Sequence, residues 1–393
     1  MPRRKILVVG AGPVGAVAAL ACARFGHDVT LLEAQQRPDD SPRASTTQPP
    51  TLEILAELGL IEEFERVGLV ARTFQFWDRD ARRLIAEFDF ERLRGETPYP
   101  YVVQTEQHKL ANMAIAAMGQ MSNAKVLLSH SLVGLSQDES QVKIETDKGL
   151  FTADYVIGCD GGRSTVRKQL DIEFEGYTWP ERFLVITTRF DFAGLLGCCS
   201  RNYMAGPGGE WTNLFKVAGD DLQGRWRAVY NTREGESDEE ALSRSSVRAR
   251  LARIFVPENQ RDYLHLNLYN VHQRVARQFR RGRVFLCGDA AHVNNPIGGL
   301  GLNCGIHEAW DLSNLLTQDD PDLDAYERRR RPLNIEYVQE QTVANKKRLE
   351  ERDPARREMR FDELRRMADD PAQYKQFLMR ASLLESSRRA LRT

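Results

Sequence analysis

The longest stretch without a charged residue lies near the start of the chain and divides into a strand, a turn and a helix. Residues 6–9 are apolar and mostly β-branched, which is the pattern of a buried parallel strand. An alanine-rich segment from Pro13 to about Phe25 predicts a helix that Gly26 ends. Glycines and a proline within this 18-residue uncharged run disfavour an export signal or a membrane span, because both need a continuous apolar helix.

The turn between strand and helix reads GAGPVG at residues 10–15, a G-x-G-x-x-G pattern. Its glycines permit a tight turn and a close approach to a pyrophosphate, and the helix N-terminus supplies amide donors. A second strand at residues 28–32 ends in Glu33, where an acidic side chain would hold ribose hydroxyls. The order of these elements predicts a dinucleotide site, in preference to a glycine-rich turn without a ligand.

Four further runs are typical of an antiparallel sheet with one covered face. They lie at residues 72–77, 183–190, 211–217 and 225–230. We expect this sheet to roof a substrate chamber. The aromatic residues that would line the chamber, with ordinary sheet packing as the alternative for each, are Tyr203, Phe215, Trp226 and Tyr230.

The last 70 residues change in character. Residues 324–393 contain 18 Lys and Arg against 13 Asp and Glu, with apolar residues interspersed. This pattern predicts amphipathic helices broken near Pro354 and Pro371. A surface for a partner or a nucleic acid is one interpretation. A solvated helical face that closes over the domain is favoured, because charges of both signs are mixed along the segment and do not form a block of one sign.

The composition is that of an ordinary globular protein. The 393 residues are 41% hydrophobic and 28% charged, with a formal net charge of −1. This balance disfavours a strongly basic nucleic-acid binder and a disordered acidic chain. Six cysteines without regular spacing indicate a reducing compartment, and we expect a cytoplasmic protein with no membrane partner.

Two apolar strands further along the chain each end in a glycine and an aspartate. Residues 153–159 lead into Asp160, and residues 283–287 lead into Asp289. An aspartate at the carboxyl edge of a strand is well placed to meet polar parts of a cofactor. The second pair is followed by PIGGLGLN at residues 296–303 and then by a helix-like segment. Glycines in that loop would let the backbone approach a planar ring closely.

The combination of GAGPVG, Glu33, Asp160-Gly, GDAAH and PIGGLGLN resembles the flavoprotein aromatic hydroxylases typified by para-hydroxybenzoate hydroxylase. The resemblance covers about residues 5–330 and implies FAD as the cofactor. We expect an α/β protein in which a Rossmann-like FAD-binding domain is interleaved with an antiparallel β-sheet substrate domain. The FAD-binding domain would take residues 1–72, 102–180 and 273–323, the substrate sheet 73–101 and 181–272, and a C-terminal helical segment 324–393.

Carried over by motif, the residues that would hold FAD are Gly10, Gly12, Gly15, Glu33, Arg43, Gln104, Asp160, Asp289, Gly301, Leu302 and Asn303. The backbone amides of Leu302 and Asn303, at a helix N-terminus, would stabilise negative charge on the N1–C2=O edge of a reduced flavin. The loop departs from many relatives in having Leu300 where they have glutamine. It also has Asn295 and Pro296 where they have two prolines.

The resemblance implies that NADH or NADPH reduces FAD, that dioxygen forms a C4a-hydroperoxide, and that its distal oxygen passes to an aromatic ring. The substrate would be a small phenolic or N-heteroaromatic compound, with or without a carboxylate. The catalytic residues are not assigned. Pro296 and His292 are candidates, and for His292 packing of the loop is favoured over proton relay.

Other functions stay open on the same sequence. A halogenase or a double-bond reductase would use the flavin differently, and a redox sensor would only hold it. The five tryptophans form no W-x-W pair, which disfavours a tryptophan-type halogenase. We find no G-x-S-x-G, no C-x-x-C and no metal-spaced His and Cys cluster, so no metal site is expected. A homodimer is a further open alternative.

Overall fold

The computed structural model describes residues 2–41 and 45–392. One half of the molecule, which contains the N-terminal strands, is built on a largely parallel sheet. All pairings in this sheet are parallel except the edge pair β18–β19. The predicted strand, turn, helix and second strand are therefore confirmed, with the predicted helix present as α1 (Pro13–Arg24). The strand order is β18 (Arg280–Arg281), β19 (Val284–Leu286), β12 (Tyr155–Gly158), β1 (Lys5–Val9), β2 (Asp28–Leu32), β8 (Ala124–Leu127).

Helix α1 is held at the centre of this half by small side chains. Every residue from Gly15 to Ala23 is buried. Alanine has a high helix propensity, and its short side chain lets neighbouring helices approach closely. Helix α1 contacts α4 (Gln107–Met118) on one flank and α9 (Gly301–Leu315) on the other. This packing fixes the glycine loop before α1 relative to the N-terminus of α9.

Smaller elements complete this half of the molecule. Two three-stranded sheets, two helices beside the second of them, and a short helix after β12 were not anticipated from the sequence. Their bounds are β9 (Leu132–Gln137), β10 (Val142–Thr146), β11 (Gly149–Ala153), β3 (Thr46–Thr47), β4 (Leu69–Ala71), β7 (Val102–Gln104), α2 (Pro49–Glu57), α3 (Ile61–Val67) and α5 (Thr165–Gln169).

The second half is an eight-stranded sheet, antiparallel except where β14 pairs with β5. The four predicted strands are all present, although the run at 183–190 is only the second part of a 15-residue strand. In order the strands are β20 (His292–Val293), β17 (His265–Ala276), β13 (Phe174–Thr188), β16 (Arg225–Asn231), β15 (Trp211–Val217), β14 (Arg201–Ala205), β5 (Thr73–Asp78), β6 (Arg83–Asp89).

The long strands β13 and β17 join the two halves. They pair with each other along most of their length and run through positions 181 and 272. The predicted division into interleaved domains therefore falls within continuous strands. It stays a prediction about folding units.

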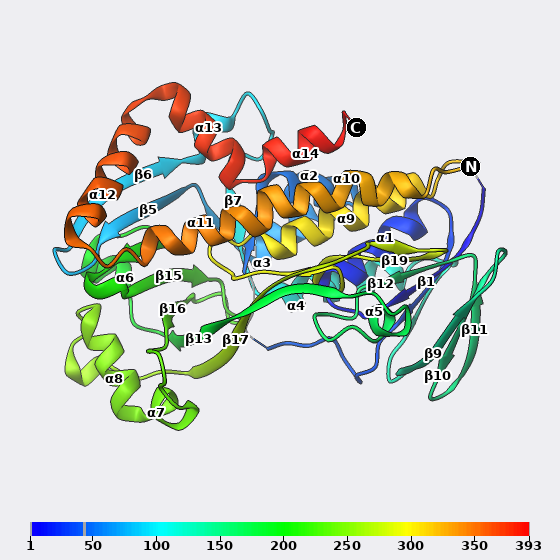
Figure 1. Ribbon diagram of the computed structural model, residues 1–393, viewed down its shortest axis with the longest axis horizontal. Helices are drawn as coiled ribbons and strands as arrows, with labels where there is room; N and C mark the ends of the chain where they lie inside the picture. Colours follow the sequence, from blue (N-terminus) through cyan, green and yellow to red (C-terminus); the bar gives the residue numbers. More distant parts are fainter. Residues whose placement is uncertain (1, 42–44, 393) are drawn as a thin grey trace.

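The eight-stranded sheet has an apolar core on each face. One face is covered by α6 (Phe192–Leu196) and α8 (Arg244–Arg253), the latter preceded by α7 (Asp238–Leu242). The other face is covered by the C-terminal helices. Figure 1 shows the tail helices and the pair α7 and α8 on opposite sides of this sheet.

The C-terminal region is helical, as predicted. A long rod crosses from one half of the molecule to the other and then turns back over the sheet (Figure 1). Asp353 and Asp370 cap the helices that begin at Pro354 and Pro371. The elements are α10 (Asp324–Asn334), the π-helical turn η5 (Ile335–Gln339), α11 (Glu340–Leu349), α12 (Pro354–Asp369), α13 (Pro371–Ala381) and α14 (Leu384–Ala390). Among the described residues, none of the helices combines the length and the apolar character needed to cross a bilayer.

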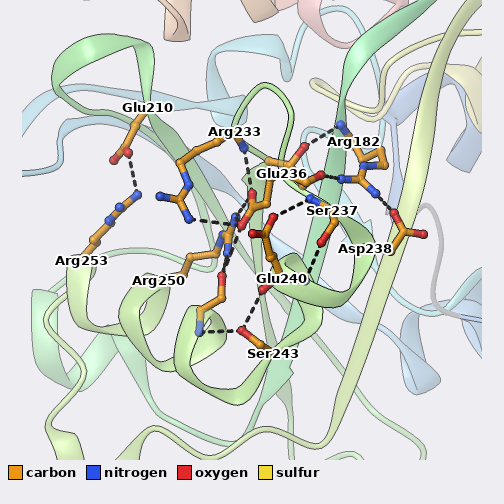
Figure 2. Close-up of polar contacts among 12 residues, drawn as sticks. Arg182, Glu210, Arg233, Glu236, Ser237, Asp238, Glu240, Ser243, Arg250 and Arg253 are labelled. Atoms are coloured by element: carbon orange, nitrogen blue, oxygen red, sulfur yellow. Dashed lines mark hydrogen bonds and ion pairs between the residues drawn. The ribbon is translucent and has the colours of Figure 1, made fainter.

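A buried ion pair ties α8 to the loop before α7 (Figure 2). Glu236 Oε2 lies 2.7 Å from Arg250 Nη2 and also accepts the N–H of Arg233 at 2.9 Å. Burial acts to raise the pKa of Glu236, but the hydrogen bonds and charge of Arg250 outweigh it and hold the pKa below its usual range. Both side chains of the pair are more than nine-tenths buried, so water cannot replace either partner if the other is removed.

The variant E236Q should unfold more easily by about 3–5 kcal/mol at neutral pH, because Arg250 keeps a buried charge without its partner. Since the pKa of Glu236 is lowered by folding, its contribution is complete above the ordinary glutamate pKa of about 4.3 and declines as the pH falls through the folded value. Urea unfolding at several pH values measures both effects. The matched control is E234Q, at an exposed glutamate two residues away. Equal stability of E236Q and E234Q at neutral pH would contradict this role.

Candidate active site

The glycine loop before α1 has two glycines that the fold requires and one that faces open space. A Cβ on Gly15 would lie 1.9 Å from the Gly10 carbonyl oxygen, and one on Gly10 would lie 2.5 Å from the Cys159 carbonyl oxygen. Gly10 also has a φ of +100°, which side-chain-bearing residues rarely adopt. A Cβ on Gly12 would meet no atom within 4 Å. This open cradle at the uncapped start of α1 fits a pyrophosphate.

Glu33, at the end of β2, is held beside this loop. Its Oε2 accepts the N–H of Ala11 at 2.7 Å, and its Oε1 accepts the N–H of Gln35 at 2.9 Å. The carboxylate is thus oriented next to the cradle, where the ribose of a dinucleotide would lie. Arg43, also predicted to contact the cofactor, lies outside the described residues.

The two predicted aspartates occupy different surroundings. Asp160 accepts the N–H groups of Thr165 at 2.6 Å and Val166 at 3.0 Å, and also the Ser164 hydroxyl. Its carboxylate therefore holds the start of α5, and burial raises its pKa above the usual value. Asp289, in contrast, is exposed on the turn after β19.

A buried charge pair supports the turn that carries Asp289. His292 Nε2 lies 2.8 Å from Glu308 Oε1, and both side chains are fully buried. Burial alone would lower the pKa of His292, but the charge of Glu308 and nearby hydrogen bonds raise it well above the usual range. The other oxygen of Glu308 accepts the N–H of Gly288 at 2.9 Å. These contacts fix the Gly288–Asp289 turn. They support packing of this turn as the role of His292.

The loop before α9 presents free backbone donors. Gly298 and Gly299 have φ values of +111° and +69°, and Leu300 caps α9 without a side-chain hydrogen bond. The N–H groups of Leu302 and Asn303 in the first turn therefore point out of the helix without intrahelical acceptors. Pro296, the other catalytic candidate, is exposed in the same loop.

The side chain of Asn303 locks this loop to the N-terminal half. Its Oδ1 accepts the N–H of Gln48 at 2.8 Å and the hydroxyl of Thr51 at 2.7 Å. Its Nδ2 donates to the carbonyl groups of Thr46 at 2.9 Å and Gly299 at 2.7 Å. All of its hydrogen-bonding groups are thus occupied by protein, which leaves the backbone amide for a ligand.

Two buried glutamines near the loop have carbonyl oxygens in need of a donor. Gln104 donates through Nε2 to the carbonyl groups of Ser200 at 3.0 Å and Lys216 at 2.9 Å, and Gln48 donates to that of Gly298 at 3.2 Å. The Oε1 atoms of both glutamines have no partner within the described chain. An unpaired buried acceptor is costly. The isoalloxazine ring of FAD carries an N3–H donor between two carbonyl groups. This donor would satisfy one of the two acceptors, so the residues present fit FAD.

An aromatic cavity of about 30 Å³ opens beside the same loop. It lies between the tail-covered face of the eight-stranded sheet and helices α11 and α13. Among the described residues, no carboxylate lines it. The lining side chains include Phe74, Phe76, Phe90, Arg201, Tyr203, Ile297, Asn345, Arg348 and Phe377, together with the backbone of Gly298.

The four predicted substrate residues divide between the two faces of the sheet. Tyr203 lines the aromatic cavity, stacked on Phe76 with ring centroids 5.3 Å apart, and Phe215 packs against Tyr203. Trp226 and Tyr230 point to the opposite face, into the core covered by α8. They do not line the aromatic cavity. Side chains along β16 alternate between the two faces of the sheet, and these two lie on the face opposite the tail helices.

A larger cavity, of about 450 Å³, lies elsewhere on the sheet half. Its lining is rich in charged side chains, several of which appear in Figure 2, and most of its cations are paired internally. Glu210 contacts Arg79 and Arg253, while Lys346 contacts Glu181 and Glu350. Tyr230 is part of this lining. The larger cavity is thus lined mainly by charged side chains, and among the described residues the loop before α9 contributes nothing to its lining.

Comparison with known proteins agrees with this geometry. The model of the FAD binding domain family matches residues 3–341. Para-nitrophenol 4-monooxygenase of a Pseudomonas species is 33% identical, with 98% of this chain and 96% of that protein covered. The 6-hydroxy-3-succinoylpyridine 3-monooxygenase of Pseudomonas putida is 32% identical, with 90% of each covered. The crystal structure of a p-nitrophenol 4-monooxygenase from Pseudomonas putida superposes with a TM-score of 0.89 at 30% identity, over 98% of each chain.

The chain belongs to the FAD binding domain family. It is an FAD-dependent monooxygenase. The resemblance to the aromatic hydroxylases, the α/β fold and the FAD cofactor, all predicted from the sequence, are confirmed. The individual cofactor contacts stay predictions. The structure brings Glu33 beside the glycine loop, and it links Gln104 to Asn303 at the start of α9 through Thr46.

Several residues of the site were not found from the sequence. Arg201, Arg348 and Gln48 carry no motif, and their roles depend on neighbours distant in the chain. Phe74 and Phe76 lie in a predicted strand and alternate toward one face, which was the one available signal. Phe377 comes from the tail, which was not linked to the substrate chamber.

The open space at Gly12 gives a direct test of the cradle. The variant G12V should fold with a stability within about 0.5 kcal/mol of the wild-type apoprotein, because its Cβ would meet no protein atom within 4 Å. It should lose FAD, because its side chain would occupy the pyrophosphate site. The variant G15A should lose stability, because its Cβ collides with the Gly10 carbonyl. FAD content after purification and thermal unfolding of the apoproteins measure the two effects. A G12V protein with wild-type FAD content would contradict the assignment.

Proposed function

We propose that this monooxygenase uses NADH or NADPH and dioxygen to hydroxylate a small, electron-rich aromatic ring that is phenolic or N-heteroaromatic. One oxygen atom becomes the new ring hydroxyl and the other leaves as water, with two electrons supplied by the nicotinamide. The observation that carries the proposal is the aromatic cavity beside Gly298. It places a space lined by aromatic side chains against the loop that would present backbone donors to the flavin.

The names of relatives support this substrate class. One similar protein is named for a nitrophenol and another for a hydroxypyridine, and both are single-ring compounds with a ring hydroxyl. The cavity in this chain is lined by several aromatic side chains, which favour offset or edge-to-face contacts with an aromatic guest.

Bound FAD would supply the electron transfer from nicotinamide and the activation of dioxygen. The chain's own groups prepare the surroundings. The N–H groups of Leu302 and Asn303 and the N-terminal dipole of α9 would stabilise negative charge on the flavin edge. Phe76 and Phe377 would exclude water from the reacting face.

Two broader predictions accompany this proposal. All six cysteines are free thiols, four of them buried, which supports a reducing compartment and hence the cytoplasm, where reduced nicotinamide is available. The homodimer stays a prediction. A halogenase, a double-bond reductase and a redox sensor would each share the FAD site but give a different product or none.

The test combines reduction with product analysis. Purified holoenzyme is reduced anaerobically by NADH or NADPH, with and without a panel of phenols and hydroxypyridines, and then exposed to ¹⁸O₂. We expect an aromatic that accelerates flavin reduction and yields a hydroxylated product with one ¹⁸O atom. A halogenated or saturated product would favour the alternative enzymes. Reduction without any product from the panel would favour a sensor, and either result would overturn the proposal.

A further inference from the structure

Arg201 is a buried cation in the aromatic cavity whose hydrogen-bond donors are only partly used. Its side chain, on β14, is only 3% exposed. Its Nη2 donates to the Tyr203 hydroxyl oxygen and to the Gly298 carbonyl, both at 3.1 Å. Its Nε and Nη1 have no hydrogen-bond partner within the described chain. A guanidinium carries five N–H donors and stays charged in proteins, so a buried one with unused donors is costly unless an anion completes it.

The neighbours of Arg201 compensate its charge only in part. Its guanidinium carbon lies 5.2 Å from the ring centroid of Phe74 and 6.0 Å from that of Phe90. Contacts of this kind offer electrostatic attraction from the ring face but no hydrogen-bond acceptor for the in-plane N–H groups. Among the described residues, no carboxylate lies within 4 Å of Arg201 to form an ion pair. The unused donors therefore require an acceptor from outside the protein.

A second cation lines the same cavity from the helical side. Arg348, on α11, donates to Asn345 Oδ1 at 3.2 Å and lies 6.0 Å from the ring centroids of both Phe76 and Phe377. Burial lowers its pKa from the usual value. The larger cavity differs, because most of its cations have carboxylate partners. Among the described residues, the aromatic cavity is lined by two guanidinium groups and no carboxylate.

We propose that the cavity selects aromatic anions, such as phenolates and aromatic carboxylates, and that Arg201 is the residue that binds the anionic oxygen through its Nε and Nη1. This inference rests on the proposed function and specifies the charge of its substrate. The Gly298 carbonyl anchors the guanidinium to the flavin loop, so a bound oxyanion is positioned relative to the cofactor. Arg348 adds positive potential for a second polar substituent on the ring.

Binding without turnover gives the test. Oxidised holoenzyme is titrated, without nicotinamide, with 4-nitrophenol or its neutral methyl ether 4-nitroanisole, and the flavin absorbance change reports the dissociation constant. At a pH where the phenol is ionised, wild type should bind the phenolate at least ten times more tightly than the ether. The variant R201M should lose on the order of 100-fold in affinity for the phenolate, as when one partner of a buried charged contact is truncated. Its affinity for the ether should change little.

The controls separate this inference from the proposed function. R352M removes an exposed arginine from the lining of the larger cavity and should leave both dissociation constants unchanged. R201K keeps a charge but loses the planar donor array, and it should fall between wild type and R201M. If R201M does not fold, the wild-type preference for phenolate over ether decides the matter. Equal binding of the two ligands, by an enzyme that hydroxylates phenols, would overturn the role of Arg201 and leave the proposed function standing.

Discussion

The carbonyl oxygen of Gly298 is the point at which three distant parts of this chain meet. It accepts one hydrogen bond from Arg201 on the eight-stranded sheet and another from Gln48, which precedes α2 in the N-terminal half. The positive φ of Gly298 is what turns the carbonyl toward both donors. The loop before α9, the sheet strand that carries Arg201 and the segment before α2 are therefore joined through one backbone group.

Buried polar groups around the loop extend this constraint to the tail. Gln273 on β17 accepts the N–H of Asn295 at 3.2 Å and donates to Gln339 Oε1 at 2.7 Å. Gln339 closes the π-helical turn between α10 and α11, and such turns inside helices are frequent at functional sites. Helix α11, which carries Arg348 and Leu349 into the aromatic cavity, is thereby linked to the loop before α9. The C-terminal helices line the aromatic cavity as well as cover the sheet.

The parts that could be predicted from the sequence are those that local patterns determine. The glycine loop, its flanking strand and helix, and the tail breaks at Pro354 and Pro371 follow from neighbouring residues and backbone sterics. The aromatic cavity could not be predicted, because Arg201 meets Phe74 and Gly298 only in the fold, and both lie far away in the chain. Alternation in β16 shows that Trp226 and Tyr230 share a face with each other. It does not show which face carries the aromatic cavity. The two side chains lie on the opposite face, and their place in a substrate chamber stays a prediction.

The proposed function requires FAD and the aromatic substrate to share the space around Gly298. A crystal structure of the holoenzyme with a bound aromatic ligand tests it most directly. The account predicts the isoalloxazine edge against the N–H groups of Leu302 and Asn303, and the ligand ring among Phe76, Tyr203 and Phe377 with its polar oxygen on Arg201. A ligand ring in the larger, charge-paired cavity, or a flavin away from the start of α9, would contradict it.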